Sequence, residues 1–139
     1  MKKLFEKEII LKTKNFIVSQ DWEVAIPGFY IIAPKKKKKT ILDFSKKEQL
    51  EYIKTVHKVR EAMKKVLKIN KVFFFQNEET PYRFHLWMLP HYPWMKKVTN
   101  GLEGEIILIW VYAKKHMNTE ENIQKTREAV TKMRKYLSK

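Results

Sequence analysis

The chain has 139 residues, no cysteine and a formal net charge of +15 at pH 7. Its length fits one domain, residues 1–139, and the missing cysteines exclude disulfides and cysteine metal sites. Because no apolar run approaches the roughly 20 residues of a spanning helix and no signal peptide is evident, we expect a cytoplasmic protein with no membrane partner. The charge favours an anionic partner such as a nucleotide or nucleic acid, unless the lysines simply solvate the surface.

Short strands are predicted in the first third of the chain. Residues 8–11 are predicted to form a strand or a short lead-in, and residues 16–18 to form the next strand. Residues 29–33 are predicted to form a buried strand, because a Pro-Gly pair opens the segment and a proline closes it. Five consecutive lysines, Lys35–Lys39, follow and concentrate positive charge at the end of this strand.

A long helix is predicted over residues 45–68. Ser45 and Glu48 have the spacing of a capping box, in which each side chain accepts from the other residue's backbone N–H. Apolar side chains then recur every three or four residues, as on the buried face of a helix.

The second half of the chain predicts more strands and a last helix. Residues 72–76 and 82–89 are predicted to form a hairpin around a polar loop, and residues 105–113 a further strand. Asn118, with Glu121 three residues on, is predicted to cap the last helix. Strands joined by hairpins, with inserted helices, indicate an α+β fold: an antiparallel sheet of about five strands with two main helices.

The segment from Arg83 to Pro90 alternates in a way that singles out one histidine. In a strand, successive side chains point to opposite faces, so the apolar residues at 84, 86 and 88 should face the core. Arg83, His85 and Trp87 then lie together on the other face. An imidazole between a guanidinium and an indole is a candidate for chemistry.

Further motifs precede this strand at fixed spacing. Asp21 is followed six residues later by Pro27-Gly28, then by an apolar strand and by Pro34 with its lysines. Together with His85 before two apolar residues and a proline, this order resembles the histidine-triad (HIT-like) superfamily of nucleotidyl hydrolases and transferases. That family has an aspartate, Pro-Gly-His, Pro-Lys-x-His and then His-x-His-x-His on the last strand of its sheet. The resemblance covers residues 16–92.

The chain departs from the family pattern at three of its histidines. Arg83 and Trp87 stand where the triad has its first and third histidines, and Lys37 stands where Pro-Lys-x-His has its last residue. Only the central triad histidine, His85, is present. The loop before the triad is also shorter than the glycine-rich loop of the family.

The resemblance implies a role for each matching residue. His85 corresponds to the nucleophile that attacks the α-phosphorus of a nucleotide; the alternative is a packed, hydrogen-bonded core histidine. In the family, a main-chain carbonyl near the third triad position holds this ring. Arg83 and Lys37 would bind phosphate oxygens, unless they are only solvated charges.

The remaining candidates concern the rest of a bound nucleotide. Asp21 corresponds to the ribose-binding acid of the family, or else it caps a turn. Asn77 and Thr80 would contact phosphate, and both are also ordinary turn residues. Trp87 would either exclude water from the site or fill the space that a triad histidine needs.

The resemblance thus implies a nucleotide hydrolase or transferase acting on a nucleoside polyphosphate, such as a dinucleoside polyphosphate, through a covalent nucleotidyl-histidine. It implies no cofactor for that step and a homodimeric assembly, and the histidine spacing predicts no metal. The alternative is a catalytically weak or inactive module that binds nucleotide or nucleic acid. A DNA repair enzyme that removes adenylate ranks last, because no DNA-binding domain is appended.

Overall fold

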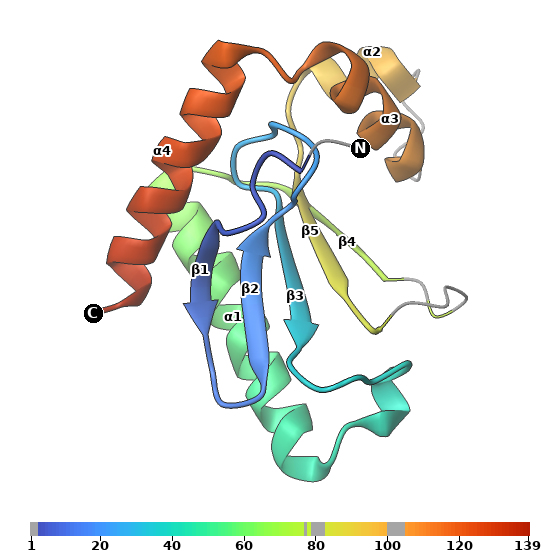
Figure 1. Ribbon diagram of the computed structural model, residues 1–139, viewed down its shortest axis with the longest axis vertical. Helices are drawn as coiled ribbons and strands as arrows, with labels where there is room; N and C mark the ends of the chain where they lie inside the picture. Colours follow the sequence, from blue (N-terminus) through green and yellow to red (C-terminus); the bar gives the residue numbers. More distant parts are fainter. Residues whose placement is uncertain (1–2, 77, 79–82, 100–104) are drawn as a thin grey trace.

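The computed structural model describes residues 3–76, 78, 83–99 and 105–139, and a five-stranded antiparallel sheet forms its centre (Figure 1). The sheet has the order β1-β2-β3-β5-β4, so that β1 and β4 are its edges. Its strands are β1 (Ile9–Lys12), β2 (Phe16–Gln20), β3 (Tyr30–Pro34), β4 (Val72–Phe75) and β5 (Leu86–Pro90). The helices are the 3-10 helix η1 (Ile41–Asp43), α1 (Lys46–Leu67), α2 (Trp94–Thr99), α3 (Ile106–His116) and α4 (Glu120–Leu137). The predicted α+β fold is confirmed.

Helix α1 begins and ends as its sequence predicts. The Ser45 hydroxyl accepts from the Glu48 amide at 3.2 Å, and the Glu48 carboxylate accepts from the Ser45 amide at 2.8 Å. The helix ends at Lys68, which adopts the left-handed conformation with a φ of 60°. Arg60 then donates to the carbonyls of Ile69 and Asn70, which fixes the chain that leads into β4.

One face of the sheet packs on α1 and α4 and holds the larger core (Figure 1). In Figure 1, α1 lies behind the sheet and α4 lies beside β1. The predicted alternation in β5 is confirmed, since its core-facing side chains are all buried here: Phe84, Leu86 and Met88. The helices contribute, among others, Val56, Val59, Met63, Val130 and Met133.

The opposite face is covered mainly at one end, where α2 and α3 gather (Figure 1). A second core forms there from the loop after β2, the end of β5 and these two helices; its buried members include Val24, Ile26, Phe29, Leu89, Met95 and Ile109. Toward the other end, the side chains of this face are only half-buried. They are Ile17, Ile31, Ala33 and His85. We call this part of the sheet the open face.

Two predictions in the last third of the chain are wrong. Residues 105–113, predicted as a strand, belong to α3, because a short run of apolar and β-branched residues fits a strand or a buried helix equally well. Asn118 does not cap the last helix; Thr119 does, accepting from the Asn122 amide at 3.2 Å. None of the helices in the described residues combines the length and hydropathy needed to cross a bilayer.

Candidate functional site

His85 lies on the open face, immediately before β5 begins. Strand β3 pairs with β5 through Ile32 opposite Leu86, so the next step of the register brings Ala33 beside His85. The imidazole is half-buried, and it belongs to neither of the two cores. The alternative of a packed core histidine is therefore not what the structure shows.

A hydrogen bond sets the orientation and the tautomer of this ring. Nδ1 of His85 lies 2.9 Å from the carbonyl oxygen of Arg83. A carbonyl can only accept, so Nδ1 carries the proton, and Nε2 of the neutral ring keeps its lone pair. The carbonyl thus comes from the first triad position, two residues before the histidine, rather than from the neighbourhood of Trp87. An imidazole in this state can act as a nucleophile.

The other side of the chain anchors the histidine to the larger core. The ring of Phe84 packs edge-on against Phe44 at 5.0 Å and Tyr52 at 5.5 Å between centroids. Its amide donates to the carbonyl of Lys38 at 2.5 Å. Because neighbouring residues of an extended chain point to opposite sides, burying Phe84 directs His85 outward.

The lysine run lies beside the same segment. Arg83 donates from Nη1 to the carbonyl of Lys35 at 3.2 Å, and the side chains of Arg83 and Lys37 are exposed. Asp43 closes the run by accepting from the amides of Thr40 and Lys39, and these two hydrogen bonds lower the pKa of its carboxyl group. The structure therefore brings the backbone of the lysine run next to Arg83. This end of the open face is strongly cationic.

Trp87 occupies the position next to His85 on the same face. Its indole lies 5.6 Å from the ring of Phe29, 5.6 Å from that of Phe75 and 6.0 Å from the imidazole. On the neighbouring strand β3, Ile31 lies directly opposite Trp87. The indole thus makes an apolar wall beside the imidazole, and it is held from both sides.

Asp21 lies at the other end of these strands, in a closed environment. Only 5% of its surface is exposed, and its carboxylate accepts from the amides of Glu23 and Val24, both at 3.0 Å. Burial raises its pKa to about 6, although the two amides and the nearby Trp110 indole oppose this shift. Trp110 is itself in α3, and its buried Nε1 makes no hydrogen bond of good geometry within the part of the chain that the structure describes. The turn-capping alternative describes the observed contacts of Asp21.

The segment that follows Asp21 is clamped by the start of the C-terminal helices. Asn118 accepts from the Ala25 amide at 2.7 Å and donates to the Glu23 carbonyl at 2.8 Å. Lys114 adds a salt bridge of 3.5 Å to the Glu23 carboxylate. These contacts were not predicted. The one sequence signal for them is the adjacent pair Asn118-Thr119. Both residue types cap helices and only one cap is needed, so the other can form hydrogen bonds elsewhere.

The remaining predicted residues divide between described and undescribed parts of the chain. Asn77 and Thr80 lie outside the described residues. Of the apolar side chains in and next to β2 and β3, Ile17 and Ile31 are half-buried on the open face, whereas Phe29 is buried in the second core. The apolar patch available to a ligand next to His85 is thus formed by β2 and β3.

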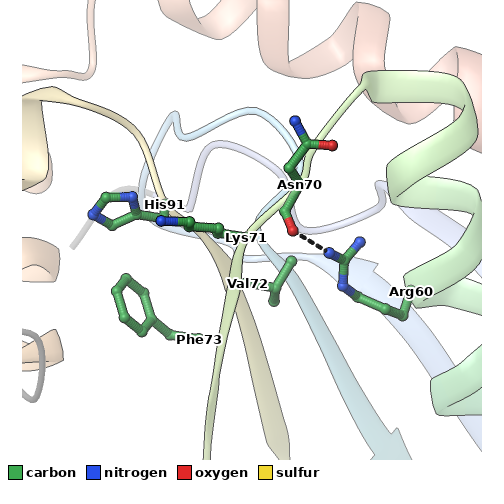
Figure 2. A pocket seen from close by; sticks show the side chains of 6 residues that line it. All are labelled: Arg60, Asn70, Lys71, Val72, Phe73 and His91. Atoms are coloured by element: carbon green, nitrogen blue, oxygen red, sulfur yellow. Dashed lines mark hydrogen bonds between the residues drawn. The ribbon is translucent and has the colours of Figure 1, made fainter.

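A separate hollow of about 410 Å³ lies at the far end of β4 and β5 (Figure 2). It is lined by Arg60, Asn70, Lys71, Val72, Phe73 and His91. Figure 2 shows the Arg60 guanidinium turned toward the Asn70 carbonyl, a contact that stabilises the end of α1. The hollow contains none of the predicted site residues. Among the residues that the structure describes, no three histidine, aspartate or glutamate side chains cluster as metal ligands would.

No protein-family model matches the chain, and no curated protein sequence matches it. Solved structures do resemble it. A hypothetical histidine triad nucleotide-binding protein from Sulfolobus tokodaii gives a TM-score of 0.62 at 13% identity, covering 94% of this chain and 85% of that one. A Zn-bound histidine triad family protein from Mycobacterium smegmatis gives 0.58 at 16% identity, covering 93% and 87%. A Hit-like protein involved in cell-cycle regulation from Bartonella henselae gives 0.54 at 21% identity, covering 87% and 84%. These similarities show a common fold.

Proposed function

We propose that this chain, which has the histidine-triad fold, hydrolyses or transfers the nucleotidyl group of a nucleoside polyphosphate through a covalent intermediate on His85. The observation that carries the proposal is the hydrogen bond of 2.9 Å between His85 Nδ1 and the Arg83 carbonyl. It leaves Nε2 as the free, unprotonated nitrogen of a half-buried ring on the open face. A nucleophilic histidine requires this tautomer and this access.

The proposed reaction has two steps. The lone pair of Nε2 attacks the α-phosphorus, a phosphorus–nitrogen bond forms, and the bond to the leaving phosphate oxygen breaks with its electron pair. Water or another acceptor then attacks the same phosphorus and releases the histidine. Arg83 binds phosphate oxygens through its planar fork and Lys37 binds them as a point charge, because both side chains are exposed at the cationic end of the sheet.

The residues around His85 favour one class of leaving group. Arginine does not deprotonate, and an exposed lysine does so only at high pH, so neither Arg83 nor Lys37 is a good proton donor at neutral pH. A departing phosphate needs no proton, whereas a departing amine does. We therefore propose dinucleoside polyphosphates and related phosphoanhydrides as substrates, and nucleotide amidates as poor ones.

Steady-state kinetics with both substrate classes test this proposal. We expect kcat/KM to be higher for the polyphosphates, and His85→Ala to lower it by at least about 10⁴-fold, as loss of a nucleophile typically does. The matched control is His91→Ala, because His91 follows the same strand but lines the hollow of Figure 2. Equal losses in the two variants, or faster turnover of the amidate, would contradict the proposal.

A second candidate, a nucleotide or nucleic-acid binding module without turnover, is favoured by the state of Asp21. This carboxylate is 5% exposed under Trp110, so a ribose reaches it only if α3 moves. Salt-sensitive binding of single-stranded RNA by the wild-type protein, with no hydrolysis of any nucleotide in the panel, is the result that selects this candidate. The lysine run and Trp87 would then contact phosphates and a base.

We also propose a homodimer, with β4 as the strand that meets its counterpart. Strand β4 is an edge of the sheet, and its Phe74 side chain is 50% exposed. An edge strand of this kind offers unpaired backbone groups to another chain. Sedimentation of the wild-type protein and of Phe74→Lys checks this assembly, and we expect the variant to be monomeric.

A further inference from the structure

Helix α3 carries apolar side chains on nearly every side. The side facing the second core is buried through Ile106, Ile109 and Ala113. The opposite side is exposed, and it consists of Ile107 (53%), Leu108 (48%), Val111 (52%) and Tyr112 (38%). We call these four residues the α3 patch.

The α3 patch is unusual within this molecule. A helix that is apolar all round is normally buried on all sides or lies in a membrane. Among the residues that the structure describes, ten large apolar side chains are markedly exposed, and four of these ten belong to this one helix of 11 residues. Such a concentration marks an interaction site more often than chance exposure.

Aromatic and cationic side chains border the α3 patch. Trp94 of α2 stacks on Tyr112 with 5.7 Å between ring centroids, and Tyr112 in turn contacts His116 at 4.7 Å. Lys115 follows Val111 by four positions on α3, so it lies on the same side of the helix, and it is exposed. Figure 1 shows α2 and α3 next to each other at one end of the molecule.

We propose that the α3 patch docks on the surface of an anionic lipid bilayer. A helix lying flat in the interface buries its apolar side among the acyl chains, while flanking lysines extend to the headgroups. Tryptophan and tyrosine are the residues that favour this boundary, and lysines near the surface are attracted by anionic lipids. The α3 patch, the Trp94–Tyr112 pair and Lys115 match this order of layers, and the net charge of +15 adds attraction to anionic lipids.

Two other occupants fit the same surface less well. For a second copy of the chain, four side chains that are each about half exposed offer less area than the roughly 800 Å² per partner of a stable interface. A nucleic acid would find cations, but isoleucine, leucine and valine offer no flat ring on which bases stack. Only a surface with acidic groups outside and an apolar interior matches both features.

This inference does not depend on the proposed function. The expectation of no membrane partner rested on the lack of a spanning segment, and a surface helix requires none. His85 lies four residues before Leu89 along β5, about 13 Å from the end covered by α3. A nucleotide therefore still reaches the cationic end of the open face while α3 contacts lipid.

Vesicle co-sedimentation of the full chain tests the inference. The probes are phosphatidylcholine vesicles with and without phosphatidylserine, at low and physiological salt. We expect binding only to the anionic vesicles, and a loss of at least about tenfold in the partition coefficient for the double variant Leu108→Glu, Val111→Glu. Vesicles should also shift the tryptophan emission of the wild-type protein to shorter wavelength.

The matched control is Leu50→Glu, Ile53→Glu on α1, where two apolar side chains are 61% and 58% exposed and the charge change is the same. Circular dichroism verifies that both double variants fold. We expect the control to bind like wild type. No binding of wild type to anionic vesicles, or equal losses in the two double variants, would overturn the inference, as would a dimer without vesicle binding that only the α3 variant dissociates.

Discussion

The two ends of this side of the sheet differ in charge, access and the way their residues are held. At one end, His85 is half-buried beside exposed Arg83 and the lysine run. At the other, Asp21 is 5% exposed, capped by two backbone amides and covered by α3. Both residues match positions of the same family pattern, yet only the His85 end is open.

For the proposed function, this contrast predicts which part of a nucleotide the fold would hold best. Phosphate oxygens would meet cations and the imidazole without any rearrangement, whereas a ribose would meet a carboxylate that already accepts two hydrogen bonds. The difference arises from the C-terminal helices, since Trp110 and Asn118 close the Asp21 end. The segment after β5, which lies almost wholly beyond the sequence motifs of residues 16–92, therefore decides how much of this side of the sheet is open.

The largest effect should come from removing the anchor behind His85. Phe84→Ala empties a site between Phe44 and Tyr52, and we expect the free energy of unfolding to fall by about 3–5 kcal/mol. Urea denaturation measures this. Leu42→Ala, in η1 and 89% exposed, is the control and should cost less than about 1 kcal/mol. Similar losses of unfolding free energy in the two variants would mean that the packing of Phe84 does not hold the segment that carries His85.

A smaller effect should appear in the pH dependence of the free energy of unfolding, to which the buried Asp21 contributes. The pKa of Asp21 is about 6 in the folded chain and 3.8 in its ordinary state, so the folded chain binds more protons between these values. Stability from this group is present below pH 3.8 and is lost as the pH rises through 6. We expect the unfolding free energy of wild type relative to Asp21→Asn to fall by on the order of 2–3 kcal/mol across this window.

The control for this titration is Asp43→Asn, in the loop of the open end. Two amides hold the pKa of Asp43 below its ordinary value, so its contribution is present at higher pH and lost on acidification. Denaturation curves at several pH values should therefore give slopes of opposite sign for the two variants. Slopes of the same sign would mean that Asp21 is not buried as described.

The smallest effect should come from a single phosphate contact. In a His85→Ala background, which prevents turnover, Arg83→Gln should weaken the binding of a nucleoside triphosphate about tenfold, or about 1.4 kcal/mol. Isothermal titration calorimetry measures this. Arg127→Gln on α4 removes the same charge from an exposed arginine that packs over Phe5. Equal weakening by both would assign the binding to net charge alone.

Local patterns predicted most of the fold. The capping box at Ser45 and the alternation around His85 each depend on a few neighbouring residues, and both are confirmed. The sequence predicted the side of the strand on which His85 lies, because its apolar neighbours at 84, 86 and 88 were expected to face the core. The contact of Arg83 with the Lys35 carbonyl joins two segments that are distant in the sequence, and only the structure shows it.

The closed end could not be predicted, because it depends on contacts between distant parts of the chain. Residues 105–113 contain enough isoleucine and valine to indicate a strand, and only their packing over Phe29 and Leu89 makes them a helix. The environment of Asp21 depends on Trp110, 89 positions further along the chain. A carboxylate that caps a turn has the same local sequence whether it is exposed or covered.

The most direct test of the account is to trap the intermediate on His85. The protein is mixed with a dinucleoside polyphosphate and quenched within milliseconds in alkaline denaturant, because the phosphorus–nitrogen bond of a modified histidine is hydrolysed in acid. Mass spectrometry of the digested chain should show one nucleoside monophosphate on the peptide that contains residue 85, and His85→Ala should show none. Turnover without this adduct, or an adduct on another residue, would contradict the account.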